Sequence, residues 1–184
     1  MLTVSTVKAA DWVIVLVGQR IPGKFNYDPR QDIHVLCPMH RGPAGVEILN
    51  QRLQETLNPP RASKSELRQG FRQLREGDRV MQIVNNYDRQ VFNGDMGSVQ
   101  KIDLEDQVVE IAFDDRLVKY DFSDLNEITH SYAISIHKAQ GSEFPVVVIP
   151  LLNQHYMMLQ RNLLYTAVTR ARKMVVLVGS RQAI

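Results

Sequence analysis

The stretch from Ser131 to Ile149, SYAISIHKAQGSEFPVVVI, places a cluster of His, Lys, Gln, Ser and Glu residues between two apolar segments. The apolar run after the cluster has the composition of a buried strand. The stability of a fold does not require polar side chains at such a place, so the cluster indicates contact with a ligand. Gly141 lies within it and allows the backbone to approach a ligand closely.

One string matches the pattern of a phosphate-binding loop, G-x-x-x-x-G-K, from Gly18 to Lys24. Phe25 stands where a Ser or Thr hydroxyl would hold Mg²⁺, and Pro29 leaves no room for the helix whose N-terminus must face the phosphates. Asp114 and Asp115 follow an apolar strand, as a metal-binding carboxylate would, but we expect them to form a hairpin turn. The sequence therefore predicts no working phosphate loop and no metal ligands. A compact kinase built on Gly18 to Lys24 stays only as a third interpretation.

Composition limits the class of protein further. The 184 residues can bury a full core, and the hydrophobic fraction of 44% with a charged fraction of 23% argues against long disorder. A net charge of +2 is too small to argue for nucleic-acid binding, which would need local patches. Cys37 is the only cysteine, no apolar run approaches the roughly 18 residues of a membrane span, and the N-terminus lacks a signal-peptide pattern. We expect a cytoplasmic protein without a membrane segment.

The first third of the chain reads as the start of an α/β unit. Ile33 to Met39 is predicted to be a buried strand, and a polar turn leads from it into a helix that ends at the proline pair 59–60. Val7 to Ile21 fits a strand by composition and a helix by spacing, with a preference for the helix. The arginine-rich stretch from Arg61 to Glu76 is expected to be a connection.

A small β module then interrupts this pattern. Short strands separated by Asn-Gly and Asp turns suggest an antiparallel barrel or meander, with strands expected at 78–84, 96–103, 107–113 and 116–122. The α/β pattern resumes with strands through SYAISI and PVVVIP, a helix from about His155 to Arg172, and a last strand, MVVLVG. The apolar runs suit a parallel sheet covered on both faces. We predict one discontinuous α/β domain over 1–75 and 127–184, with a β insertion over 76–126.

Four stretches resemble, in order, motifs of the RecD-like (RecD and TraA type) superfamily-one 5′-to-3′ DNA helicases. Val35 to Gln54 is similar to motif IV with its following helix, and Gly77 to Val99 to the start of the SH3-like insertion. Ser131 to Ile149 resembles motif V, and Asn162 to Gly179 resembles motif VI. The resemblance implies a second RecA-like motor domain, with a parallel sheet and helices on both faces, interrupted by an SH3-like β-barrel. The first motor domain of the family, with its Walker A loop, has no counterpart, so we expect a C-terminal fragment of a longer helicase.

The resemblance also implies ATP with Mg²⁺ as cofactor, bound mainly by the missing domain and hydrolysed between two motor domains. Arg170 matches the motif VI arginine that reaches the γ-phosphate, and Arg41 matches the supporting arginine of motif IV. A planar guanidinium fork suits both tasks better than lysine. Glu143 resembles the carboxylate that accepts hydrogen bonds from the ribose. The nucleotide-binding residues implied are Gln140, Gly141, Glu143 and Arg172. Arg172 lies two residues beyond Arg170 on the same predicted helix and points elsewhere, so it can also be interpreted as simply pairing with an acid.

Single-stranded DNA is implied to lie against hydroxyl, imidazole and ammonium donors. The DNA-binding residues implied are Ser135, His137, Lys138 and Ser142 of motif V, with Asn86 and Tyr87 of the β module. Tyr87 would stack on a base. Each has a bland alternative: His137 as a structural residue, Lys138 as a solvated charge, and the Asn-Gly and Asp stretches as turns only.

The sequence thus predicts the C-terminal motor segment of an ATP-dependent DNA helicase, similar to exodeoxyribonuclease V alpha and inactive without its phosphate-binding domain. The expected partners are single-stranded DNA, the N-terminal RecA-like domain of the same parent and, as an open case, recombination nuclease subunits, with no membrane. The alternative is a free-standing, non-catalytic module that binds DNA or a protein. The presence of both Arg170 and Glu143, whose roles need a nucleotide, speaks against that alternative.

Overall fold

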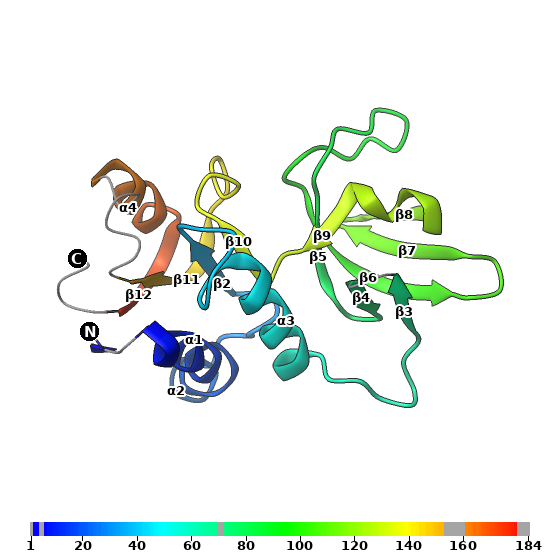
Figure 1. Cartoon of the computed structure of the whole chain (residues 1–184). Helices are drawn as coiled ribbons and strands as arrows, with labels where there is room; N and C mark the ends of the chain where they lie inside the picture. The colour runs from blue at the N-terminus through cyan, green and yellow to red at the C-terminus, as the bar shows by residue number, and fades with distance from the viewer. Residues whose placement is uncertain (1, 4–5, 70–71, 153–160, 180–184) are drawn as a thin grey trace. The chain divides into compact units, whose positions relative to one another are not determined.

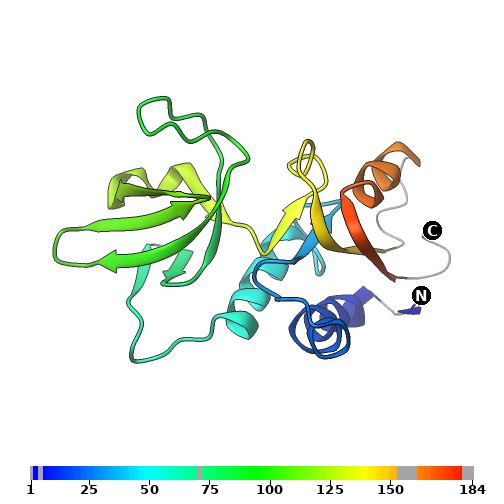
Figure 2. The same cartoon turned by 180° about the vertical axis from the view of Figure 1, so that it is seen from behind.

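The computed structural model describes residues 2–3, 6–69, 72–152 and 161–179 of the chain. The chain forms two compact units (Figures 1 and 2). Unit 1 comprises Met1–Leu57 and Tyr132–Ile184, and unit 2 comprises Asn58–Ser131. The unit boundaries differ from the division expected from the sequence, because residues 58–75 and 127–131 lie in unit 2.

Unit 1 is built on a parallel sheet with the strand order β1-β12-β11-β2-β10. The bounds are Leu2–Thr3 for β1, Ile33–Cys37 for β2, Ala133–Ser135 for β10, Phe144–Leu151 for β11 and Ala171–Gly179 for β12. All of β2 is buried, and so is β11 from Val146 to Leu151. Continuous apolar strands such as these are typical of a parallel sheet covered on both faces, so the expected α/β architecture is confirmed.

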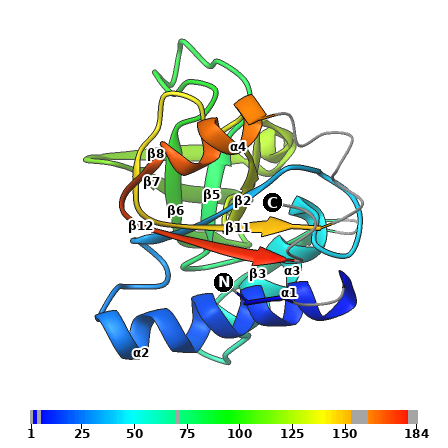
Figure 3. The same cartoon turned by 90° about the vertical axis from the view of Figure 1, so that its left-hand side faces the viewer.

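Helices cover this sheet from two sides. Their bounds are Thr6–Val15 for α1, Leu16–Arg20 for a π-helical turn, Ile21–Phe25 for α2, Val46–Leu57 for α3 and Arg161–Val168 for α4. Figure 3 shows α1 and α4 on opposite sides of β11 and β12. Val13 of α1 and Leu53 of α3 belong to one buried cluster with Val35 of β2 and Val146 of β11.

Two expectations for helices are settled by these bounds. The helical interpretation of Val7 to Ile21 is confirmed, and the helix continues through Gly18 to Lys24, which therefore do not form a strand-to-helix phosphate loop. The predicted helix from His155 to Arg172 is wrong at its end, because α4 ends at Val168 and β12 begins at Ala171. Arg172 consequently lies in a strand. The beginning of that predicted helix, 155–160, falls outside the described residues.

Unit 2 is an antiparallel sheet with the strand order β8-β7-β6-β5-β9. The bounds are Arg79–Gln82 for β5, Met96–Asp103 for β6, Val108–Phe113 for β7, Arg116–Asp121 for β8 and Ile128–His130 for β9, with a 3₁₀ helix at Phe122–Glu127. The four predicted strands are confirmed. The turn prediction for Asp114 and Asp115 is also confirmed, with Asp114 at φ 47°. The core of unit 2 contains Val80, Val99, Val109, Ile111, Phe113 and Tyr120.

The stretch from Arg61 to Glu76 was expected to be a plain connection, and this is wrong. It contains a hairpin of β3 (Glu66–Gln69) and β4 (Arg72–Arg75). Leu67 lies opposite Leu74, and both pack against the core of unit 2. These two leucines give the hairpin an apolar side although its other residues are mostly polar.

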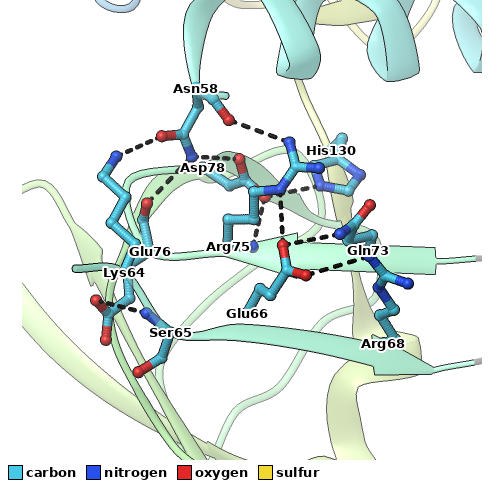
Figure 4. A network of polar contacts seen from close by, with 10 residues as sticks. All are labelled: Asn58, Lys64, Ser65, Glu66, Arg68, Gln73, Arg75, Glu76, Asp78 and His130. Atoms are coloured by element: carbon cyan, nitrogen blue, oxygen red, sulfur yellow. Dashed lines mark hydrogen bonds and ion pairs between the residues drawn. The ribbon is translucent and has the colours of Figure 1, made fainter. Parts of the chain in front are cut away.

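A buried carboxylate joins the two ends of unit 2 (Figure 4). Asp78 is fully buried; it accepts a hydrogen bond from Asn58 Nδ2 at 2.7 Å and one from the Arg75 amide at 2.8 Å, and it lies 3.1 Å from His130 Nε2. Burial alone would raise the pKa of Asp78, but the bonds with His130, Asn58 and the Arg75 amide outweigh it and hold the pKa below its usual range. Asn58 is the first residue of unit 2, and His130 is next to its last residue. The Asp78 side chain therefore contacts both ends of the insertion.

Candidate functional site

The loop 136–143 carries most of the predicted site and runs back along the sheet. Ser135, at the end of β10, is level with Cys37 of β2, whereas Val146 of β11 is level with Ile33 of β2. Because all three strands are parallel, the loop must return from the carboxyl end of β10 to the amino end of β11. Its residues Ile136 and Ala139 are buried and anchor it to unit 1.

The polar residues of this loop are mostly exposed. His137, Gln140, Gly141 and Glu143 are exposed, and Ser142 is half-buried. Gly141 has φ 85°, a left-handed conformation that favours glycine, and open space lies where a Cβ would be. The glycine is therefore required by the turn, and it leaves the backbone of the loop accessible.

Ser135 differs from the other predicted DNA contacts because it is only 6% exposed. Its Oγ accepts a hydrogen bond from the amide of half-buried Lys138 at 3.3 Å. The hydroxyl thus shapes the turn that presents His137 and Lys138. In this structure the buried Ser135 side chain supports the turn.

Arg170 lies between α4 and β12 and is half-buried. Its guanidinium donates to the carbonyl oxygen of Thr166 at 3.3 Å, to that of Ser142 at 3.2 Å and to Thr169 Oγ1 at 3.3 Å. The bond to Thr166 places a cation at the carboxyl end of α4, where the helix dipole favours positive charge. Thr166 and Thr169 are supporting residues that the sequence did not single out for this task.

Arg172 and Glu143 form an ion pair with 2.9 Å between Arg172 Nε and Glu143 Oε2. Their side chains are 63% and 55% exposed, respectively. An exposed pair of this kind contributes little to stability and exchanges easily with other partners. The interpretation of Arg172 as the partner of an acid describes its contact in the structure, and the acid is the predicted ribose ligand.

Arg41 lies beyond β2, in the turn before α3, and is exposed. The turn is closed by bonds from the Val46 amide to the Met39 carbonyl at 3.1 Å and from the Glu47 amide to the His40 carbonyl at 3.2 Å. Within the described residues, the structure brings Glu143, Ser142, Arg170 and Arg172 together and does not bring Arg41 into contact with them.

Asn86 and Tyr87 lie in unit 2, on the loop between β5 and β6. The Asn86 side chain donates to Glu127 at 3.0 Å, and its backbone pairs with Val91. Tyr87 is 74% exposed and makes an edge-to-face contact with Phe92, with ring centroids 5.8 Å apart. Asn86 therefore holds the loop, as the turn interpretation expected, and Tyr87 presents an aromatic surface.

The sequence reasoning did not single out Asn50, a buried polar residue that supports the site. Asn50 of α3 donates from Nδ2 to the Ala133 carbonyl at 2.7 Å and accepts from the Ala133 amide at 2.9 Å. It fixes β10, which lies at the edge of the sheet and leads into the loop 136–143. Its one signal in the sequence is a polar residue beside Leu49 and Leu53 on the apolar side of a predicted helix.

The donor set of the site suits phosphate and ribose oxygens. Its charged members are arginines and one carboxylate, and the described residues contain no group of three or more His, Cys, Asp or Glu that could hold a metal ion. None of the described helices is long and apolar enough to cross a bilayer.

Two family models match the chain. Residues 49–113 match the SH3 domain of ATP-dependent RecD-like DNA helicases, and residues 130–178 match the UvrD-like helicase C-terminal domain. The parallel sheet with its antiparallel insertion is therefore the RecA-like fold of superfamily-one helicases with an SH3-like barrel. Both models, together with the relatives below, show that the chain is related to the RecD-like helicases.

Known proteins support the same relationship. The chain is 38% identical over 151 residues to the ATP-dependent RecD2 DNA helicase of Deinococcus radiodurans, a match that covers 82% of this chain and 20% of that protein. It is 31% identical over 150 residues to the RecBCD enzyme subunit RecD of Buchnera aphidicola, covering 79% of this chain and 24% of that one. The chain thus spans about a fifth to a quarter of the length of these relatives.

A solved structure shares the fold. It is the Pif1 helicase from Bacteroides in complex with ADP-AlF3 and ssDNA, with a TM-score of 0.59 and 19% identity. The match covers 97% of this chain and 49% of that chain.

Proposed function

We propose that this chain is the second motor segment of an ATP-dependent DNA helicase of the RecD-like type. The observation that carries the proposal is the joining of motif V and motif VI: Arg170 bonds the Ser142 carbonyl, and Arg172 bonds Glu143. Residues from two parts of the chain thus form one cationic cluster next to an exposed glycine turn. A non-catalytic module is not favoured, because both matching family models describe helicase domains.

In this proposal Arg170 stabilises the transferring γ-phosphoryl group. Its planar fork of N–H donors fits phosphate oxygens, and an arginine supplied from outside the phosphate loop accelerates phosphoryl transfer by about 10³ to 10⁵. Glu143 would accept hydrogen bonds from the ribose, with Gln140 and Gly141 beside it and Arg41 as a second phosphate contact. ATP supplies the phosphoryl group, and its Mg²⁺ would be held by a domain outside this chain.

In unit 1, DNA would contact the turn that carries exposed His137 and half-buried Lys138. In unit 2, Tyr87 would supply a separate aromatic contact. Donors of these types bind backbone phosphates, and exposed rings stack on unpaired bases. We further propose 5′-to-3′ travel and, as partners, the N-terminal motor domain of the same parent and subunits of a recombination nuclease. The direction of travel and the motor-domain partner are implied by the resemblance of the motifs, and the nuclease subunits by the likeness to the RecD subunit of RecBCD.

The proposal is tested in a chimera, in which this chain replaces the matching segment of the Deinococcus radiodurans RecD2 helicase. DNA-stimulated ATP hydrolysis is expected in the chimera and a loss of about 10³-fold or more with Arg170→Ala. Arg61→Ala is the matched control, since Arg61 is exposed and outside the cluster. The isolated chain should not hydrolyse ATP. Full hydrolysis by the Arg170→Ala chimera, or turnover by the isolated chain that Arg170→Ala abolishes, would contradict the proposal.

A further inference from the structure

Arg170 is bonded to the loop 136–143 as firmly as to its own helix. Its Nη1 donates to the Ser142 carbonyl, and its own carbonyl accepts a bond from the Phe144 amide at 2.8 Å. The residue thus binds the chain on both sides of Glu143. Glu143 itself is bonded by Arg172, so residues 142, 143 and 144 are all held by Arg170, just before β12, and Arg172, within it.

The carboxyl half of the loop depends on these contacts. From Gln140 to Phe144, every hydrogen bond that reaches the loop from another element comes from Arg170 or Arg172, within the described part of the chain. The bonds inside the loop are long: 3.2 Å from the Gln140 amide to the His137 carbonyl and 3.2 Å from the Ser142 amide to the Ala139 carbonyl. Gly141, with open space where a Cβ would be, adds no packing of its own.

We propose that Arg170 is also a positioning residue for the His137–Lys138 turn, through the Ser142 carbonyl. Removal of this bond frees the segment from Gln140 to Ser142, which is continuous with the turn. The buried Ile136 and Ala139 hold the other side of the turn. The side chain that closes one end of the loop is therefore the one that the proposed function directs toward a phosphate.

The bond to the Ser142 carbonyl and the proposed contact with a phosphate compete for the Arg170 guanidinium. A guanidinium and a phosphate carry opposite charges and can form two parallel hydrogen bonds, whereas the Ser142 carbonyl is neutral and accepts one, so a phosphate within reach would draw Arg170 away from Ser142. The Ser142 carbonyl would then lose its donor, and the turn would gain freedom. Nucleotide occupancy would be passed to the DNA-facing turn by the exchange of one hydrogen bond. This last step rests on the proposed function, whereas the positioning role does not.

The positioning role is tested by hydrogen exchange on the chain itself, comparing the wild type with Arg170→Ala. The amides of Ala139, Gln140 and Ser142 are expected to exchange about fivefold faster in the variant, as the loss of one hydrogen bond of ordinary net strength predicts. The amides of Val147 and Val148 in β11 serve as an internal reference for the sheet. Arg172→Ala is the matched control, because Arg172 bonds the Glu143 side chain and leaves the loop backbone alone.

Unchanged exchange of the loop amides in Arg170→Ala, or equal acceleration in Arg172→Ala, would overturn the inference. Should Arg170→Ala open the sheet as well, Arg170→Lys decides the matter. Lysine keeps the charge but cannot bond Thr166 and Ser142 with a fork, so the loop should exchange faster while Val147 and Val148 do not. Wild-type exchange of the loop in a lysine variant with an intact sheet would again overturn it.

Binding of a fluorescent oligo-dT by the same proteins separates this inference from the proposed function. Faster loop exchange in Arg170→Ala, in a chain whose wild type does not bind oligo-dT, supports positioning and contradicts the DNA role. Binding by the wild type, with loop exchange unaffected by Arg170→Ala, supports the DNA role and contradicts positioning.

Discussion

The side-chain amide of Asn50 exchanges two hydrogen bonds with the backbone of Ala133, donating at 2.7 Å and accepting at 2.9 Å. A neighbouring strand would make the same pair of bonds. β10 has β2 on one side and no further strand of the described sheet on the other, so α3 satisfies part of its free edge. The loop 136–143 begins three residues after Ala133, and its position therefore depends on a helix residue far away in the sequence.

Asn50→Ala should lower the free energy of unfolding of unit 1 by about 3 kcal/mol, because it leaves the buried N–H and C=O of Ala133 without partners. Urea unfolding followed by the fluorescence of Trp12, which packs against the core of unit 1, measures the change. Gln51→Ala is the control, since Gln51 is the exposed neighbour on the same helix. Equal stability of the two variants would show that Asn50 does not hold β10.

The buried carboxylate of Asp78 predicts that the stability of unit 2 falls in acid. Its pKa is held below the usual range in the folded chain, so the unfolded chain binds a proton first as the pH falls. The stabilisation is present above about pH 4, the ordinary range of an aspartate, and is lost as the pH falls through the lower folded pKa. Protection of the Val109 and Ile111 amides, corrected for intrinsic exchange, should fall in that window.

Asp78→Asn should remove this dependence and cost about 1 to 3 kcal/mol at pH 7, through the lost bonds to His130 and the Arg75 amide. Asp115→Asn, an exposed carboxylate in the β7–β8 turn, should leave both stability and its pH dependence unchanged. A pH profile of Asp78→Asn parallel to that of the wild type would assign the acid dependence to other groups.

The aromatic surface of Tyr87 and Phe92 should bind unpaired bases. Tyr87→Ala is expected to weaken oligo-dT binding by about 5- to 150-fold, the range of one base stacked on one ring. Stability should change little, because both rings are exposed. Leu117→Ala, which removes an exposed apolar side chain elsewhere in unit 2, is the control in a fluorescence anisotropy titration. Equal affinity of the Tyr87 and Leu117 variants would exclude stacking at this loop.

Glu143 should discriminate between ribose and deoxyribose in the chimera described above. Glu143→Gln keeps the shape of the side chain but loses its charge, and Glu143→Ala removes it. Both should raise KM for ATP more than KM for 2′-deoxy-ATP, about 10-fold for a lost hydrogen bond to a charged group. A smaller shift of KM in the same direction is expected for Arg172→Ala, because this variant loses the side chain that positions the Glu143 carboxylate. Parallel changes for both nucleotides would place Glu143 away from the 2′-hydroxyl.

Periodicity was sufficient to predict most of the fold. The alternating pattern of β7 and the continuous apolar runs of β2 and β11 report burial directly, and each strand lies where its pattern indicated. The hairpin of β3 and β4 was not predicted, because Leu67 and Leu74 are its main apolar residues among charged ones. The end of α4 escaped because Thr169 and Arg170 continue the helical spacing without a glycine or proline to stop it.

The candidate site was predictable residue by residue but not as a set of contacts. The cluster around Gly141 stands out because polar residues interrupt an apolar pattern, and Arg170 because it matches a motif. Buried polar partners such as Asn50 and Asp78 look like ordinary surface residues in the sequence. Their roles come from contacts 83 and 52 residues away, with Ala133 and His130, respectively. The local sequence pattern does not report contacts between residues so far apart.

The attachment of Asn58 and His130 to one carboxylate gives the insertion a modular character. Its entry and exit segments meet at Asp78, so the host chain could be closed across the gap from Leu57 to Tyr132 with a short linker. A cassette with adjacent ends can be gained, lost or transplanted between proteins without rebuilding either partner. The same geometry makes unit 2 suited to expression by itself, because both of its ends are already bound to Asp78.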